Sequence, residues 1–242
     1  MSAALSVISG TKKPDFIRPM IVKMAREAKE PNAGDFPRSV VYYAANQQIY
    51  GESDIATRFY SVISGTVRTC RFLIDGRRQI DGFHCAGDIF GIEAGATHAF
   101  SAEAVSDCTL AAFRQHNVAA MTLHNAELSR LLFSYATRSM RRAQEHALLL
   151  GIRSAQERVA TFLMGWAKQC KGGTVAELAM TRQDIADHLG LTIETVSRTF
   201  TVLEQEKRIT MRNPRQVHIQ GLWSLSHAAD EITATRRFYM RE

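Results

Sequence analysis

Cysteine is scarce in this sequence of 242 residues. The four cysteines, Cys70, Cys85, Cys108 and Cys170, lie far apart, contain no C-x-x-C pair, and leave the first 69 residues without any cysteine. This spacing argues against a disulfide framework and offers no paired-cysteine metal site. We therefore expect reduced, mostly buried thiols in a cytoplasmic chain.

Long apolar runs and catalytic motifs are also lacking. No apolar run approaches the ~20 residues that a membrane span needs, so we expect no membrane partner. The N-terminal sequence MSAALSVISGTKKPDF has no charge before its short apolar run and no clear cleavage site, and we assign residues 1–35 to a tail with a short helix. Without a nucleophile elbow, a P-loop or a metal-spaced cluster, we expect neither an enzyme nor a metal site.

The composition is that of an ordinary globular protein, with 45% hydrophobic and 22% charged residues. A chain of this length can form two domains. The net charge of +6 is compatible with a polyanionic partner, but the excess is divided equally on either side of residue 150. An argument for such a partner must therefore come from the placement of particular side chains.

The most informative stretch is TRQDIADHLGLTIETVSRTF, residues 181–200. Ile185 and Leu189 belong to an apolar face at helical spacing. Gly190 can end this first helix, because glycine tolerates the positive φ of many helix C-termini, and Thr192 can cap the next one. Two short helices joined by a glycine turn form a helix-turn-helix, whose second helix enters the major groove of DNA.

The second helix separates its side chains into two faces. Val196 and Phe200 are expected to turn inward, and Glu194, Ser197 and Arg198 outward. Arginine can donate to guanine, glutamate can accept from cytosine, and serine serves several bases, each good contact discriminating by roughly 1–3 kcal/mol. The alternatives are a helix-turn-helix used only for packing and a plain surface ion pair between Glu194 and Arg198.

A β-hairpin is predicted next, over RITMRNPRQVHI, residues 208–219, with its turn at Asn213-Pro214. Such a hairpin forms the wing of a winged helix-turn-helix. Arg208, Arg212 and Arg215 fall on it and can contact phosphates, although solvated arginines on a surface loop are the alternative for at least one of them. Our assigned DNA-backbone contacts are Thr181, Arg182, Thr192, Thr195, Arg212 and Arg215.

Residues 36–116 read as short β-strands separated by glycine-rich turns, which predicts an antiparallel β-roll or barrel. The period then becomes helical over residues 117–150, which we assign to a long dimerisation helix, although core packing is the alternative reading of its apolar stripe. The stripe residues assigned to the dimer interface are Leu128, Leu131, Leu132, Tyr135 and Leu150. Gly151 is a candidate hinge, and residues 151–242 form the winged helix-turn-helix domain, beginning with a helix over residues 154–168.

A β-roll, a long helix and a winged helix-turn-helix in that order resemble the CRP/FNR superfamily of bacterial transcription regulators. The motifs that carry the resemblance are SGTVR from Ser64, GDIFG from Gly87, AQERVATFL from Ala155 and TRQDIADHLGLTIETVSRTFTVLE from Thr181. The E-x-x-S-R pattern ending at Arg198 is similar to the FixK branch.

The resemblance implies a homodimer that reads a palindrome similar to TTGAT…ATCAA. Arg198 would read the guanine, Glu194 the paired cytosine, and Ser197 a neighbouring base. It further implies RNA polymerase as a partner, activation of transcription, and target genes of microoxic respiration or nitrogen metabolism, including nitrogen fixation.

Departures from the family pattern concern the signal. The absence of N-terminal cysteines argues against the iron–sulfur cluster of oxygen sensors. Ile92 follows Gly91 where cyclic-nucleotide binders have a glutamate, and the stretch HAFSAEA from His98 has no arginine to hold a phosphate. We therefore expect no cofactor.

The alternative is a haem- or small-ligand-dependent sensor of the same superfamily, with His84 beside Cys85, or His98, as an axial ligand. Cys170 is a candidate oxidation switch, against the simpler expectation of an inert thiol.

Overall fold

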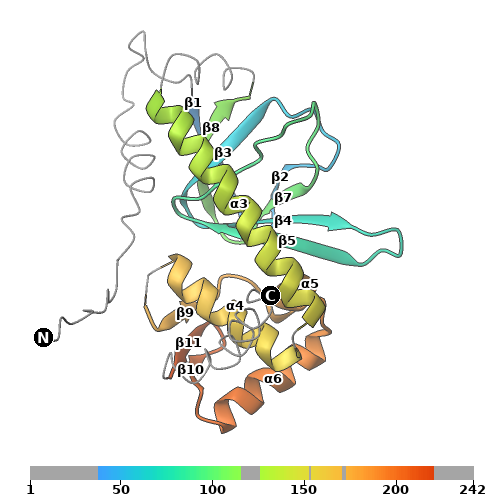
Figure 1. The fold of residues 1–242 in the computed structure, drawn as a ribbon, viewed down its shortest axis with the longest axis vertical. Coiled ribbons are helices and arrows are strands. Elements are labelled where there is room, and N and C mark those ends of the chain that lie inside the picture. The colour runs from blue at the N-terminus through green and yellow to red at the C-terminus, as the bar shows by residue number, and fades with distance from the viewer. Residues whose placement is uncertain (1–37, 116–125, 153, 171–172, 221–242) are drawn as a thin grey trace, which may run out of the picture.

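The computed structural model describes residues 38–115, 126–152, 154–170 and 173–220. They form a β-rich N-terminal part, a long helix, and a C-terminal part of helices and short strands (Figure 1). The predicted fold class is confirmed. Among the described residues, no helix has both the length and the apolar character needed to cross a membrane. The expected N-terminal tail lies outside these residues.

The N-terminal part is a β-roll of two four-stranded antiparallel sheets. One sheet has the strand order β1-β8-β3-β6 and the other β2-β7-β4-β5, so the chain passes repeatedly between them. The strands are β1 (Arg38–Tyr43), β2 (Gln48–Tyr50), β3 (Arg58–Ser64), β4 (Thr66–Phe72), β5 (Arg78–Cys85), β6 (Ile89–Phe90), β7 (Ser101–Ala104) and β8 (Cys108–Arg114). All of them fall within the predicted range 36–116.

The alternation along β8 shows how the roll is packed. Leu110 and Ala112 face the cluster between the two sheets, whereas Ala111 and Phe113 face a second apolar cluster. Successive side chains of a strand point to opposite faces, so this central strand, buried on both faces, serves two cores. Tyr135 of the long helix packs against the second cluster.

Aromatic rings fill the interior of the β-roll between the sheets. The ring of Tyr50 stacks on the His98 imidazole, with centroids 3.6 Å apart, and lies 5.9 Å from the Tyr60 ring. Phe90 stacks on Tyr60 at 5.4 Å. Offset stacking of buried rings adds to the stabilisation that their burial supplies.

The turn of the SGTVR motif depends on Gly65. Its φ of +88° lies in the region that favours glycine, and a Cβ at this position would collide with the carbonyl oxygen of Asp107 and the sulfur of Cys108. The glycine therefore allows the β3–β4 turn to pack directly against the start of β8.

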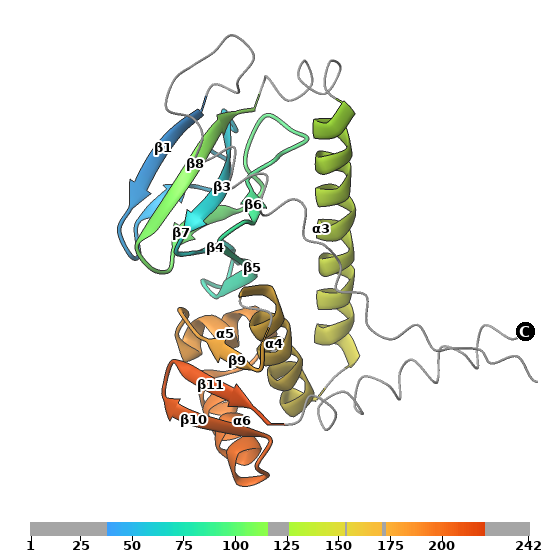
Figure 2. The same ribbon diagram turned by 90° about the vertical axis from the view of Figure 1, so that its left-hand side faces the viewer.

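The long helix, α3 (Ala126–Ile152), lies along one side of the β-roll and reaches the C-terminal part (Figure 2). Residues 116–125, where the predicted helix begins, lie outside the described part of the chain. The helix includes Gly151, the expected hinge, in its last turn, so the break between helices follows that residue.

The C-terminal part contains the predicted helix-turn-helix and wing. Its elements are α4 (Ala155–Cys170), β9 (Val175–Glu177), α5 (Arg182–Leu189), α6 (Ile193–Gln205), β10 (Ile209–Asn213) and β11 (Gln216–Ile219). Val159, Phe162 and Leu163 form the buried face of α4. The wing has three strands in the order β10-β11-β9, and β9 was not predicted because three residues show too little alternation to be recognised.

The β4–β5 hairpin inserts apolar side chains into the core of the C-terminal part. Ile80 and Phe83 belong to the same buried cluster as Leu163, Ile185 and Leu189. The Phe83 ring also meets the rings of α4 edge-on. One continuous apolar core therefore joins the β-roll to the helix-turn-helix.

A buried ion-pair network crosses the same junction. Oδ1 of Asp184 lies 3.0 Å from a guanidinium nitrogen of Arg68 and 2.6 Å from one of Arg78. Arg68 also reaches Glu103 at 2.6 Å, and Arg78 reaches Asp187 at 2.8 Å. The side chain of Asp184 is only 3% exposed, and such a buried charge is tolerated only when several charged partners satisfy it.

Removal of the Asp184 charge tests the importance of this network. Asp184→Asn keeps the size of the side chain but leaves two arginines facing a neutral amide, and breaking a buried pair typically costs about 3–5 kcal/mol. We expect the free energy of unfolding, measured in urea, to fall by about this amount. The control is Glu52→Gln, which breaks the exposed 2.9 Å pair with Arg71 and should cost less than about 1 kcal/mol. Equal effects of the two substitutions would contradict a supporting role for Asp184.

His188 of α5 also joins the two parts. Its Nδ1 donates to the carbonyl oxygen of Ile80, 3.0 Å away, since a carbonyl can only accept. The ring stacks on His146 at 4.2 Å and meets Phe83 and Phe162 edge-on. Burial, with the neighbouring His146, lowers the pKa of His188 from 6.5 to about 3, although the hydrogen bond to Ile80 opposes this shift.

This lowered pKa predicts a loss of stability in acid. Below about pH 6.5 the unfolded chain binds a proton at this histidine, whereas the histidine of the folded chain stays neutral. The free energy of unfolding is therefore unaffected by His188 above that pH and decreases as the pH falls below it. Between pH 7 and pH 5 the loss attributable to His188 is roughly 2 kcal/mol. Urea titrations of the wild type and of His188→Gln at both pH values measure it. An identical pH dependence in the two proteins would contradict the prediction.

Candidate nucleic-acid interface

The first helix of the helix-turn-helix is fixed at both ends. At the start of α5, Oγ1 of Thr181 accepts from the backbone N–H of Asp184, and the Asp184 carboxylate accepts from the Thr181 N–H at 2.9 Å. This reciprocal pair is a capping box. At the other end, Gly190 adopts φ +61° and its N–H bonds back to Ala186. The predicted stop at Gly190 is confirmed.

The second helix begins where the sequence predicted. Thr192 is the N-cap of α6, and its side chain accepts from the backbone N–H of Thr195. Val196 and Phe200 are buried, as predicted. These contacts set the axis of α6 against α5, because the apolar face can point only toward the shared core.

Glu194, Ser197 and Arg198 are all exposed on the opposite side of α6, as predicted. In the described residues, no ion pair joins Glu194 to Arg198, so the alternative of a simple surface pair has no support from this geometry. Glu194 lies in the first turn of α6, where a carboxylate interacts favourably with the helix dipole. The three side chains thus leave their hydrogen-bonding groups available to an external partner.

Arg182, which we predicted to contact the DNA backbone, also makes contacts within the protein. Its guanidinium lies 3.5 Å from the centroid of the Phe200 ring, and it donates to the carbonyl oxygen of Pro214 at 3.3 Å. Burial lowers its pKa. These intramolecular contacts hold α5, α6 and the wing together. The sequence does not show this role, because the three segments come together only in the folded chain.

The predicted threonine contacts are mostly engaged in capping. Thr181 and Thr192 use their hydroxyl groups as N-caps, and Oγ1 of Thr195 lies 3.0 Å from that of Thr192. A capping hydroxyl lies beside the open N–H groups of a helix start, which is also where a phosphate binds. Their assignment as DNA-backbone contacts therefore remains a prediction, and their position at the helix starts is compatible with it.

The wing carries free cations near α6. Arg212 on β10 and Arg215 in the β10–β11 turn are exposed, whereas Arg208 forms a 2.8 Å ion pair with Glu206. The side chain of Asn213 accepts from the Arg215 N–H at 2.9 Å and closes the turn. Of the three predicted wing arginines, two present their guanidinium groups to solvent.

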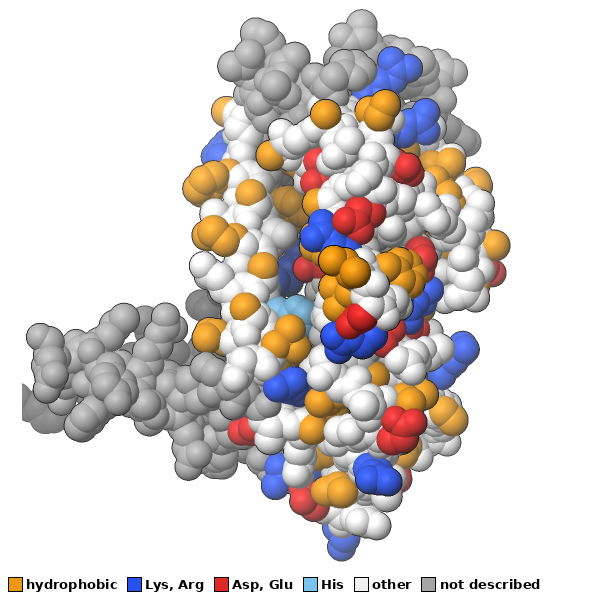
Figure 3. All heavy atoms as spheres, turned by 90° about the vertical axis from the view of Figure 1, so that its right-hand side faces the viewer, with side chains coloured by type: hydrophobic (Ala, Val, Ile, Leu, Met, Phe, Trp, Pro, Cys, Tyr) orange, Lys and Arg blue, Asp and Glu red, His pale blue; other side chains and the backbone are white. Residues whose placement is uncertain are grey.

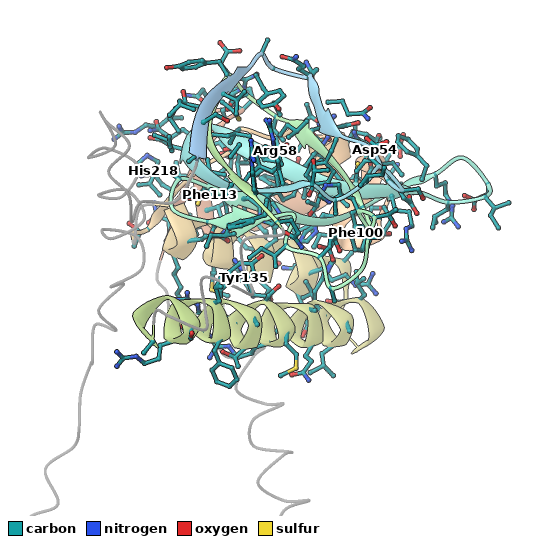
Figure 4. All side chains as sticks on the ribbon, turned by 90° about the horizontal axis from the view of Figure 1, so that it is seen from above. Asp54, Arg58, Phe100, Phe113, Tyr135 and His218 are labelled. Atoms are coloured by element: carbon teal, nitrogen blue, oxygen red, sulfur yellow. The ribbon has the colours of Figure 1, made fainter. Side chains whose placement is uncertain are left out.

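The predicted dimer residues lie largely on the inner face of α3. Tyr135 points from α3 toward the β-roll (Figure 4) and donates to the carbonyl oxygen of Ile89 at 3.0 Å. Leu132 is half-buried, and Leu150 lies beside Gly190 of the helix-turn-helix. The side chains of the other two predicted residues, Leu128 and Leu131, lie outside the described part. Periodicity detected an apolar stripe but could not say which surface it covers.

A different stripe of α3 faces away from the β-roll. Phe133 is 72% exposed, Met140 59% and Leu148 57%, and hydrophobic side chains run along this face of the helix (Figure 3). Phe133, Met140 and Ala147 are spaced by seven residues, the repeat that brings side chains to one seam of a coiled coil.

The candidate haem ligands are enclosed by protein groups. His84 stacks on Phe90 at 5.2 Å, with its Nε2 3.1 Å from Oγ1 of Thr69, and burial lowers its pKa. His98 is 4% exposed and stacks on Tyr50. Neither ring, as placed, presents a nitrogen to an open space beside it.

Three of the four cysteines, Cys70, Cys85 and Cys108, are buried. Burial raises the pKa of Cys70 to about 11, which disfavours the reactive thiolate. Cys170 is the last residue of α4, and its side chain lies outside the described residues.

Comparison with known proteins identifies this architecture. A family model described as "Cyclic nucleotide-binding domain" matches residues 40–125, and one described as "Crp-like helix-turn-helix domain" matches residues 157–227. The nitrogen fixation regulation protein FixK of Rhizobium meliloti is 42% identical over 202 residues, covering 84% of this chain and 92% of that protein. The chain belongs to the FixK branch of the CRP/FNR superfamily.

Further relatives agree with this assignment. FixK of Azorhizobium caulinodans is 46% identical over 181 residues, with 72% of this chain and 73% of that protein covered. The solved structure of FixK2 from Bradyrhizobium japonicum superposes with a TM-score of 0.75 at 35% identity, covering 78% of this chain and 96% of that one. As a CRP/FNR member with a helix-turn-helix, the chain is a DNA-binding transcription regulator.

Proposed function

We propose that this CRP/FNR regulator binds, as a homodimer, a palindrome similar to TTGAT…ATCAA and activates transcription from it with RNA polymerase in the cytoplasm. The observation that carries the proposal is the exposed, unpaired set of Glu194, Ser197 and Arg198 on a helix whose opposite face is buried. Arg198 reads guanine, Glu194 accepts from the paired cytosine, and Ser197 contacts a neighbouring base.

Side chains around α6 are positioned to contact the DNA backbone in the proposed complex. Arg212 and Arg215 on the wing supply phosphate contacts that fix the register without reading sequence. The threonines at the helix starts, Thr181, Thr192 and Thr195, lie where phosphate oxygens approach open N–H groups. Arg182 acts from beneath by holding α5 to α6 through Phe200.

The exposed stripe of α3 supports the homodimer. Two copies of Phe133, Met140 and Leu148 would remove large apolar side chains from water when the helices pair, and burial of each is worth about 1.5–3 kcal/mol. A palindromic site matches the two-fold symmetry of such a dimer, with half-sites about one turn of DNA apart.

We propose that DNA binding requires neither a cyclic nucleotide nor an iron–sulfur cluster. Ile92 occupies the position after Gly91, and the ring of Tyr50 packs within 3.0–3.4 Å of where a Cβ on Gly91 would lie. The stacked rings of Tyr50, Tyr60 and His98 occupy the roll interior beside it. The names of the FixK relatives refer to the regulation of nitrogen fixation, which supports our proposal that this chain regulates genes of nitrogen fixation and microoxic respiration.

Arginine substitutions separate base reading from phosphate contact. Arg198→Ala should lose about 1–3 kcal/mol on the TTGAT…ATCAA duplex and little on a scrambled duplex, because a base contact discriminates. Arg215→Ala should weaken binding to both duplexes alike and reduce the salt slope by about one. Fluorescence anisotropy with ligand-free and metal-free protein at fixed salt measures both.

Two results would contradict the proposal. Equal affinity of the wild-type protein for the palindrome and the scrambled duplex would remove the proposed specificity. Equal losses on both duplexes for Arg198→Ala would remove its assigned role while leaving DNA binding intact.

A charge placed on the exposed stripe tests the dimer. Met140→Glu would bury a carboxylate at the seam of α3, which is costly without a partner, so the dimer dissociation constant should rise by at least about tenfold. Ile55→Glu makes the same type of change at a side chain 75% exposed on the β-roll and should leave the dimer intact. Sedimentation equilibrium measures the association of both variants. A Met140→Glu variant as dimeric as the wild type would place the interface elsewhere.

A further inference from the structure

We infer that a cleft between the β-roll, α3 and α4 binds a small phosphate-bearing anion. This basic cleft has a volume of about 240 Å³. Its lining includes Asp88, Arg138, Arg141, Arg142, Lys168 and Gln169.

The charge of the basic cleft is strongly unbalanced. Four cationic side chains line it, from Arg138, Arg141, Arg142 and Lys168, against the single carboxylate of Asp88. Like charges gathered around one cleft repel each other and create a positive potential inside it. An anion that entered would relieve this repulsion.

The single negative charge of Asp88 offsets at most one of these four cations, and two uncharged donors fix the position of its carboxylate. Its Oδ2 accepts from the backbone N–H of Cys85 at 2.9 Å and from Nε2 of Gln169 at 2.7 Å. Within the described residues, Arg142 is the one cation that reaches its other oxygen, at 3.7 Å. The Asp88 carboxylate therefore acts chiefly to hold the loop before β6 against α4. Most of the positive charge of the cleft has no nearby negative charge.

Two of the cations have no acidic partner within the described part of the chain. Arg138 is half-buried and forms no ion pair there, and Lys168 near the end of α4 forms none either. Arg141 forms an exposed 3.7 Å pair with Glu145 on its own helix, which is worth little in water. A half-buried guanidinium without a carboxylate is best satisfied by an anion from solution.

The residue types and the size of the cleft define the ligand class. Arginine presents a planar fork of donors that fits phosphate oxygens in bidentate fashion, and lysine adds a point charge. Drug-sized ligands occupy about 300–1,000 Å³, so the smaller basic cleft suits a compact anion of the size of pyrophosphate.

The location separates this cleft from the proposed DNA surface. The lining residues come from the loop before β6, from α3 and from α4, whereas α6 lies at the end of the C-terminal part far from the β-roll (Figure 1). The side chain of Tyr135 marks the inner face of α3, toward the β-roll (Figure 4). A bound anion would therefore connect the roll, the long helix and the first helix of the DNA-binding domain.

Isothermal titration calorimetry with sodium pyrophosphate, at physiological ionic strength and without DNA, tests the site. We expect saturable binding to the full-length protein. Arg138→Ala and Lys168→Ala should each weaken it by about tenfold, the effect of losing one charge-assisted contact. Arg130→Ala is the matched control, because it removes one exposed cation of α3 outside the cleft and should leave the affinity unchanged.

Three outcomes would overturn the inference. They are a lack of saturable binding in the millimolar range, unchanged binding by both cleft variants, and an equal loss in Arg130→Ala, which would indicate attraction to charge in general. Lys168 is exposed on α4, so its variant keeps the test valid even if Arg138→Ala unfolds. Because the assay contains no DNA, its result is independent of the proposed promoter recognition.

Discussion

The carboxylate of Asp184 joins the two halves of this molecule. It closes the capping box of α5 with Thr181 and accepts from Arg68 and Arg78 of the β-roll at 3.0 and 2.6 Å. One side chain therefore sets both the start of the first helix-turn-helix helix and its position against the roll. The apolar contacts of the β4–β5 hairpin act over the same junction, so the ion pairs are shielded from water, where such pairs would contribute little.

This junction has a direct bearing on DNA recognition. The orientation of α6 follows from that of α5, because Arg182 over Phe200 and the shared core hold the two helices together. Packed groups therefore connect the β-roll to α6, whose exposed face we propose to read bases. The basic cleft lies at the other end of this connection, between the roll, α3 and α4, where a small anion would act on the same assembly.

Local features, such as helix ends and outward-facing positions, were predicted correctly where neighbouring residues in the sequence determine them. Gly190 in the left-handed region, Thr192 as a cap and the exposed position of Arg198 all follow from residues only a few positions apart. The apolar stripe of α3 was harder, since an amphipathic helix shows the same period whichever surface it covers. Tyr135 proved to contact its own β-roll, and the face with Met140 was left to solvent.

The sequence by itself determined the order of the elements, the boundaries of the helix-turn-helix and the residues on the outward face of α6, because short-range periodicity and capping chemistry decide these features. Only the tertiary structure decided that Arg68 and Asp184, 116 positions apart, share a buried ion pair. It also decided that the Arg182 guanidinium packs on the Phe200 ring of α6 and that Arg138 and Lys168 line one cleft. A charged residue looks the same in a sequence whether it is solvated or buried, and only the segments folded against it supply its partners and its dielectric surroundings.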